Sequence, residues 1–110
     1  MPFLTFRRLA LAATIALAIP AGFTPAFARD VTVTISNFAF APEATTIAPG
    51  DTVTFVNGDD TIHSVVADDG SFHSDGLDTN DKATFSFAKA GTFGYHCGLH
   101  PFMKGEIVVK

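Results

Sequence analysis

The sequence predicts an all-β domain, either an antiparallel sandwich or a barrel. Apolar and polar residues alternate over short stretches, as they do in half-buried strands. Clusters of Gly, Pro, Asn and Asp separate these stretches, and the only helical pattern after residue 28 is one possible turn near residues 74–78. The chain has 110 residues, 47% hydrophobic and 16% charged, which is the composition of a single folded domain.

The first 28 residues have the pattern of a cleavable export signal. Arg7-Arg8 precedes an uncharged apolar run, Leu9–Ile19, and the small-residue cleavage pattern Ala26-Phe27-Ala28 follows it. The apolar run is too short to cross about 30 Å of hydrocarbon as a helix, which disfavours a membrane anchor. We therefore expect a secretory signal peptide over residues 1–28 and one domain over residues 29–110, located in a bacterial periplasm with no membrane span after cleavage.

Seven strands are expected in the processed chain, each bounded by turn-forming residues. The alternation is clearest in Val31-Thr32-Val33-Thr34-Ile35 and in Thr52-Val53-Thr54-Phe55-Val56. Turn sequences such as Pro49-Gly50-Asp51 and Asn57-Gly58-Asp59-Asp60 separate neighbouring strands. In chain order, the seven expected strands are 31–35, 44–47, 52–56, 63–67, 83–87, 92–97 and 106–109.

Aromatic and acidic residues receive structural interpretations first. Phe55, Phe85, Phe87 and Phe93 fall on strand patterns, so we expect them in the core. The aspartates between the strands are assigned to turns and to solubility, with a steering patch for a basic partner as the alternative. They are Asp59, Asp60, Asp68, Asp69, Asp75, Asp78 and Asp81.

Charge and cysteine content exclude several classes of protein. Eleven acidic residues outnumber seven basic ones, two of which leave with the signal peptide, so we expect no nucleic-acid partner. A single cysteine allows no internal disulfide, and no Cys-x-x-Cys-His motif for covalent haem occurs. A domain of about 80 residues without a disulfide is usually supported by a metal or by oligomerisation.

The residues that carry chemistry lie near the C-terminus. Cys97, His100 and Met103 are spaced three and three apart, between a strand ending at Cys97 and another beginning near Gly105. A tight loop there can turn a thiolate, an imidazole and a thioether toward one point, and His63 supplies a second imidazole. Two imidazoles, a thiolate and a weak thioether are the ligands of a blue-copper site, whereas structural zinc rarely uses Met. The alternative, a buried Cys beside an accidental His, explains this spacing less well.

The same residues resemble a known family. Tyr95-His96-Cys97-x-x-His100-Pro101-Phe102-Met103-Lys104-Gly105 is similar to the ligand loop of the cupredoxins, the type 1 blue copper proteins, and its short spacing is most similar to that of the amicyanins. The resemblance extends from about Val31 to Lys110. It also includes the stretches Asn37-Phe38-Ala39-Phe40-Ala41-Pro42, Pro49-Gly50-Asp51-Thr52-Val53 and Asp69-Gly70-Ser71-Phe72.

This resemblance implies a Greek-key β-sandwich of about seven to eight strands that binds one copper ion. It places the metal ligands at His63, Cys97, His100 and Met103. One position departs from the family pattern, because family members usually carry Asn after the first ligand His and this chain has Ser64. The shorter side chain can make only part of the network that joins the two ligand segments, but the Ser64 N–H could still donate to the Cys97 sulfur.

The remaining histidines have structural interpretations. His73 lies in a turn with no partner at ligand spacing, so we expect a solvated surface residue. His96 precedes Cys97, so strand alternation points its side chain away from the metal, where it faces solvent or serves as a second point of electron entry.

The function implied is single-electron transfer in the periplasm by cycling between Cu(II) and Cu(I). No general acid–base pair or substrate pocket marks an enzyme. His100, flanked by Leu99, Pro101 and Phe102, is expected to emerge through an apolar collar suited to transient redox partners, with the protein a monomer. Resemblance to amicyanin suggests an amine dehydrogenase as donor and a c-type cytochrome as acceptor. The alternatives are a periplasmic copper chaperone or copper-resistance or storage protein, and a metal-free interaction domain.

Overall fold

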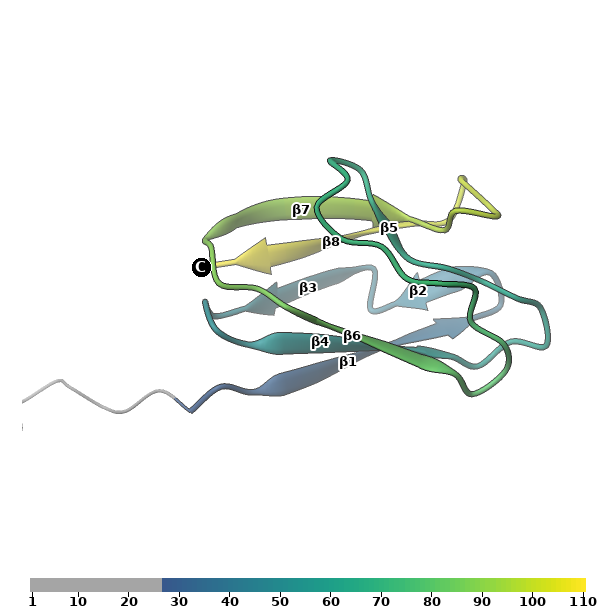
Figure 1. Ribbon diagram of the computed structural model, residues 1–110, viewed down its shortest axis with the longest axis horizontal. Helices are drawn as coiled ribbons and strands as arrows, with labels where there is room; N and C mark the ends of the chain where they lie inside the picture. Colours follow the sequence, from purple (N-terminus) through teal and green to yellow (C-terminus); the bar gives the residue numbers. More distant parts are fainter. Residues whose placement is uncertain (1–26) are drawn as a thin grey trace, which may run out of the picture.

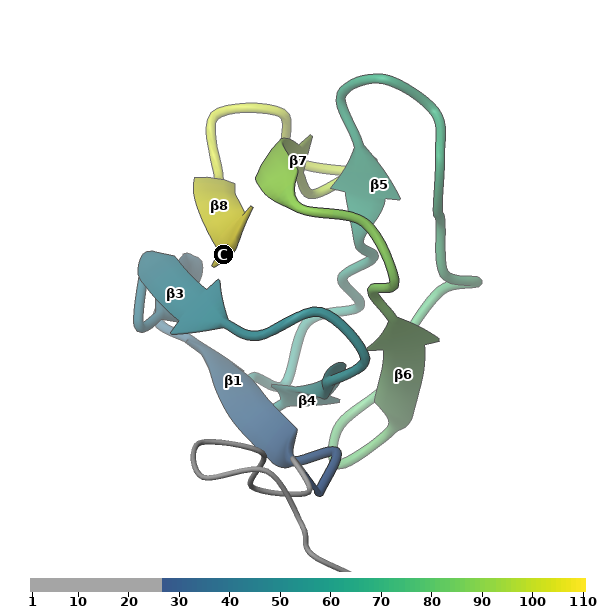
Figure 2. The same cartoon turned by 90° about the vertical axis from the view of Figure 1, so that its left-hand side faces the viewer.

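The structure is a computed structural model that describes residues 27–110, and in this part of the chain eight strands form two four-stranded sheets (Figure 1). One sheet has the order β2-β1-β4-β6 and the other the order β3-β8-β7-β5, and the two face each other as layers (Figure 2). The strands are β1 (Asp30–Ser36), β2 (Ala39–Ala41), β3 (Ala44–Ile47), β4 (Thr52–Asn57), β5 (Val66–Ala67), β6 (Lys82–Ser86), β7 (Gly91–His96) and β8 (Lys104–Val109).

The all-β prediction is confirmed, but the antiparallel expectation is wrong in part. β1 pairs with β4 in parallel, with Val33 opposite Phe55, and β3 pairs with β8 in parallel, with Thr45 opposite Ile107. The remaining strand pairs are antiparallel. Alternation of apolar and polar residues records which face of a strand is buried, and it is the same for either direction of pairing.

Two strand predictions need correction. β2 was missed, because three residues are too few to show alternation and their single buried side chain is Phe40. The strand expected over 63–67 shrinks to β5, since His63 instead forms an isolated bridge to Leu77 in the following connection. His63 therefore pairs with Leu77 and not with a strand of either sheet.

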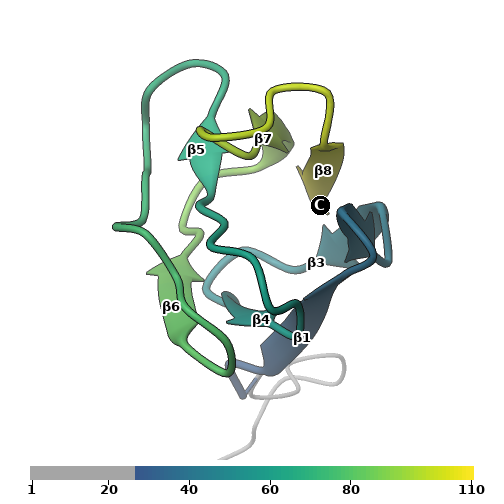
Figure 3. The ribbon, with the colours of Figure 1, turned by 90° about the vertical axis from the view of Figure 1, so that its right-hand side faces the viewer.

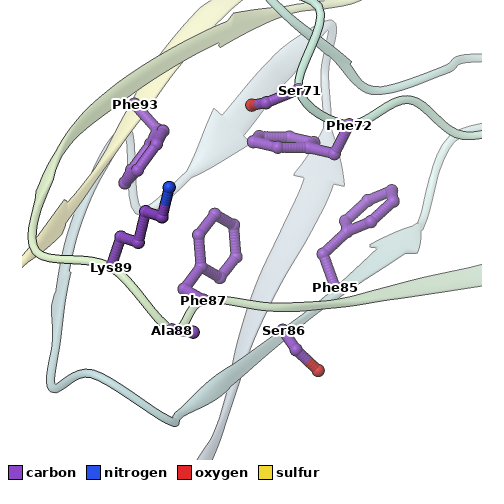
Figure 4. A pocket seen from close by; sticks show the side chains of 8 residues that line it. All are labelled: Ser71, Phe72, Phe85, Ser86, Phe87, Ala88, Lys89 and Phe93. Carbon is purple, nitrogen blue, oxygen red and sulfur yellow. The ribbon is translucent and has the colours of Figure 1, made fainter.

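The core lies between the two sheets and combines aliphatic with aromatic side chains. Phe55 and Phe87 are buried, whereas Phe85 and Phe93 are half-buried against the core, so all four expected phenylalanines lie there. Phe72 joins them at the open edge of the sandwich beside β6, with its ring centroid 4.9 Å from that of Phe85 (Figure 4). A cleft of about 330 Å³ remains there, lined by these rings and crossed by the exposed Lys89.

The two ends of the sandwich carry different segments. The start of β1, the β3–β4 turn and the C-terminus lie at one end (Figure 1). The β7–β8 loop, the connection that follows β4 and the connection that precedes β6 lie toward the other end, which Figure 3 views directly. The expected signal peptide lies outside the described residues except for its last two, and residues 27–110 contain no helix able to cross a membrane.

Candidate metal centre

Three of the predicted ligand residues meet at one end of the sandwich. The donor atoms of His63, Cys97 and His100 all lie within 4.8 Å of one another. The Cys97 sulfur is 3.7 Å from Nδ1 of His63 and 3.7 Å from Nδ1 of His100. A side chain from the segment after β4 thus meets two from the segment after β7.

His63 is fixed by backbone bonds on both sides. Its N–H donates to the Leu77 carbonyl at 3.1 Å, and its own carbonyl accepts the Leu77 N–H at 2.6 Å. The side-chain amide of Asn57, fully buried at the end of β4, donates to the carbonyls of Thr61 and Leu77 at 2.9 and 2.7 Å. His63 itself is fully buried, so its position is set by the surrounding protein.

Asp59 orients the His63 ring, a role that the sequence analysis missed. Asp59 Oδ2 lies 2.9 Å from Nε2 of His63, which assigns the ring proton to Nε2 and leaves the lone pair on Nδ1, facing the sulfur. We interpreted Asp59 as one of the turn-forming or solubilising aspartates. The only signal in the sequence is its position four residues before His63. That spacing predicts a contact between two side chains only within a helix, and residues 59–63 are not helical.

The same carboxylate holds a turn between β1 and β2. It accepts the N–H groups of Asn37 at 2.7 Å and Phe38 at 2.9 Å, two residues with left-handed backbones of φ 51° and 56°. The hydrogen bond from the Phe38 N–H is the main cause that holds the pKa of the Asp59 carboxyl below its ordinary value, and the His63 contact adds to it. Burial opposes this lowering. The Phe38 ring consequently lies edge-on to both His63 and His100, at 5.1 and 5.2 Å.

Ser64 links the two donor-bearing segments, as the sequence analysis expected. Its N–H donates to the Cys97 sulfur at 3.4 Å, and its hydroxyl accepts the Gly98 N–H at 2.9 Å. An added Cβ at Gly98 would lie 2.7 Å from that hydroxyl, so the close approach requires a residue without a side chain. An N–H aimed at sulfur stabilises a thiolate there.

The loop between β7 and β8 holds the other candidate ligands. The Cys97 N–H donates to the Met103 carbonyl at 3.0 Å, and the Met103 N–H donates to the His100 carbonyl at 2.9 Å. Met103 is 2% exposed and joins the core, whereas His100 is half-buried. Leu99 and Phe102 stand out into solvent, 54% and 70% exposed.

The other two histidines lie outside this cluster. His73 is exposed, as expected, and its backbone bridges to Val66. His96 is half-buried, and its Nδ1 lies 2.7 Å from Asp68 Oδ1. Neither contributes a donor atom to the group formed by His63, Cys97 and His100.

The donor set fits copper. A buried thiolate and two imidazoles combine a soft ligand suited to Cu(I) with borderline ligands suited to Cu(II). The Ser64 N–H satisfies the sulfur without blocking it, and Asp59 leaves one His63 nitrogen free for a metal. The three donors therefore form a group that can bind one copper ion.

Comparisons with known proteins indicate the family of this chain. The model of the cupredoxin-like domain family matches residues 7–109. An amicyanin from Paracoccus versutus is 34% identical over 88 residues, and an amicyanin from Paracoccus denitrificans is 29% identical over 85 residues. The aligned regions cover 76% and 73% of this chain but only 67% and 65% of those two proteins, about two thirds of their length.

A solved structure gives the same result for the fold. The purple cupredoxin from Nitrosopumilus maritimus superposes with a TM-score of 0.69 and 27% identity, covering 74% of this chain and 100% of that one. Amicyanins and cupredoxins are electron carriers and not enzymes, and the expectation that this chain is not an enzyme is confirmed. By its sequence, its two-sheet fold and its donor group, the chain belongs to the cupredoxin-like domain family, whose cofactor is copper.

Proposed function

We propose that the protein is a periplasmic type 1 copper protein that carries one electron between redox partners. The observation that carries this proposal is the meeting of two imidazole nitrogens and one thiol sulfur, all within 4.8 Å of one another, where His63 and Cys97 are fully buried and His100 is half-buried on a loop with an exposed tip. Copper bound there would supply a one-electron couple between Cu(II) and Cu(I).

The proposed ligands are His63, Cys97, His100 and Met103. Met103 is included because its backbone is hydrogen-bonded to both Cys97 and His100 and its side chain is buried. His63 is held by Asp59 and Cys97 by Ser64, so neither side chain needs to move when the charge of the site changes. A site that is already arranged for both oxidation states keeps the cost of reorganisation low.

An apolar collar around the His100 edge is proposed as the docking surface. The collar consists of Phe38, Leu99 and Phe102, which are 43%, 54% and 70% exposed. The Phe102 ring centroid is 6.0 Å from that of His100. A small apolar patch suits brief encounters with larger redox proteins. A dehydrogenase donor and a c-type cytochrome acceptor remain the proposed partners, with the protein a monomer.

Spectroscopy and voltammetry of the copper-loaded protein test the proposal. We expect an intense visible charge-transfer band that Cys97→Ala abolishes and the matched control His73→Ala leaves unchanged, because His73 lies outside the donor group. Reversible one-electron voltammetry identifies an electron carrier. Tight Cu(I) binding without a reversible couple would instead favour a copper chaperone, resistance or storage protein, and a colourless protein that binds only zinc would contradict the central claim.

Export is tested separately. The periplasmic fraction of a bacterium expressing the full chain should contain a protein whose mass corresponds to a start at Arg29. An uncleaved protein of 110 residues in the cytoplasm would contradict the proposed location without affecting the copper site.

A further inference from the structure

Asp51 is a buried carboxylate at the end of the sandwich opposite the metal centre. It is 2% exposed and follows the turn between β3 and β4. Its backbone joins that turn to the chain after β6, because the Asp51 carbonyl accepts the Phe87 N–H at 3.1 Å. A carboxylate removed from water in this way needs partners for both oxygens.

The partners of Asp51 come from two segments. Oδ2 accepts the Ala48 N–H at 2.9 Å, within the turn itself. Oδ1 accepts the backbone N–H of Arg29, also at 2.9 Å. The Arg29 guanidinium lies 3.6 Å from Oδ2, but its side chain is 68% exposed, so water weakens this contact. The hydrogen bond from the Arg29 N–H, and after it the one from the Ala48 N–H, holds the pKa of Asp51 below its ordinary value. Asp51 is therefore charged at neutral pH.

Arg29 is the first residue after the proposed signal peptide. In the uncleaved chain its nitrogen is an amide that offers one N–H and no net charge. After hydrolysis of the Ala28–Arg29 bond the same atom becomes an α-ammonium group with a full positive charge. The position of this nitrogen is already set, because the Arg29 carbonyl accepts the Thr52 N–H at 2.9 Å where β1 begins to pair with β4.

We propose that Asp51 is the receptor for the amino terminus created by signal-peptide cleavage, so that processing forms an ion pair which locks β1 onto the β3–β4 turn. Before cleavage Asp51 receives a neutral N–H, and afterwards it receives an ammonium at the same position. Charge-assisted hydrogen bonds of this kind are about twice as strong as neutral ones. The mature protein is thereby more stable than any form that retains leader residues.

This inference rests on the proposed export and cleavage after Ala28, but its test does not require export or copper. Two metal-free chains are compared, one starting at Arg29 and one starting at Ala28, both released from a cleavable fusion. All eight strands lie within residues 30–109, so both chains contain the whole fold. The two chains have the same net charge, and the extra residue moves the ammonium by about 3.8 Å along the chain.

We expect the chain starting at Arg29 to unfold about 3–6 °C higher than the chain starting at Ala28. In the Asp51→Asn background the difference should disappear, because the receptor carries no charge. Equal midpoints in the native background, or a difference that survives Asp51→Asn, would overturn the proposal. Mass analysis of the exported protein addresses cleavage independently, so failure of the export proposal is distinguishable from failure of the ion pair.

A second measurement needs no variant at Asp51. Acetic anhydride at neutral pH should modify the α-amine of the Arg29 chain several-fold more slowly than that of the Ala28 chain, because a paired ammonium is a poor nucleophile. Lysine side chains in the same samples serve as internal controls, since they are the same in both chains. Equal labelling rates for the two α-amines would contradict the ion pair even if Asp51→Asn did not fold.

Discussion

The two segments that supply the donor atoms are held in opposite ways. The segment over residues 57–65, called the buried segment after its fully buried side chains Asn57 and His63, is tied to the fold by several bonds. They come from the Asn57 amide, from the paired backbones of His63 and Leu77, and from Asp59. The loop over residues 97–104 has two backbone bonds of its own, and Ser64 joins it to the first segment by two more: the Gly98 N–H donates to the Ser64 hydroxyl, and the Ser64 N–H donates to the Cys97 sulfur. Its tip is exposed at Leu99 and Phe102.

The site has two requirements, and each segment meets one of them. The buried segment fixes one nitrogen whether or not a metal is bound, because the polar atoms around it are satisfied by protein. The exposed loop presents the His100 edge to a partner, and it depends on Ser64 for its position relative to the buried segment. Substitutions in the buried segment should therefore cost stability, whereas substitutions in the loop should alter local order and electron exchange.

The largest expected effect comes from removing the Asn57 amide. Asn57→Ala should lower the free energy of unfolding of the metal-free protein by about 2–3 kcal/mol, because it deletes bonds to Thr61 and Leu77 in a fully buried place. Denaturant unfolding measures this loss. A loss below about 0.5 kcal/mol would mean that the buried segment is not held as the structure indicates.

Asp59→Asn should cost about 1–2 kcal/mol at neutral pH, because one oxygen cannot replace a carboxylate that accepts from Asn37, Phe38 and His63. The Phe38 N–H lowers the folded-state pKa of Asp59, so its contribution is complete above the ordinary value of 3.8 and is lost as the pH falls through the lower folded value. The difference between the two proteins should therefore shrink from pH 5 toward pH 3. A constant difference across this range would contradict a role for the charged form.

Ser64→Ala tests the link that the Ser64 hydroxyl makes between the segments, and it leaves the Ser64 N–H bond to the Cys97 sulfur in place. It should cost about 1 kcal/mol and raise the hydrogen-exchange rate of the Gly98 amide, because that N–H loses its acceptor, while the His63 amide is unaffected. Ser86→Ala is the matched control, since Ser86 is exposed on β6. Equal acceleration at both amides would show that the two segments are not held independently.

The smallest effect on stability is expected at the tip of the loop. Phe102→Ala should change the free energy of unfolding by less than about 0.5 kcal/mol, because Phe102 is 70% exposed. Electron exchange with a redox partner should nevertheless slow down if the collar is the docking surface. Stopped-flow reduction by a small-molecule donor is the control, since it does not need the collar and should proceed at the native rate.

Much of the site is readable because its residues are close together in the chain. Cys97, His100 and Met103 form a spaced motif within one turn region, and their chemistry depends on residue type more than on register. The Ser64 N–H bond to sulfur was also expected, because Ser64 follows His63 directly. Asp59 and Phe38 were not expected at the centre, because their contacts with His63 depend on a turn that alternation does not reveal.

The features of the fold likewise fall into those that the sequence predicts and those that it does not. Alternation and turn chemistry determined the all-β class, six of the eight strands to within a residue or two, and the four phenylalanines that pack in or against the core, since each of these follows from local pattern and burial. Only the tertiary structure decided that β1 pairs in parallel with β4, that β3 pairs in parallel with β8, and that Asp51 meets Arg29. These contacts join residues far apart in the chain, and their register is set by how the two sheets pack together, which no local pattern contains.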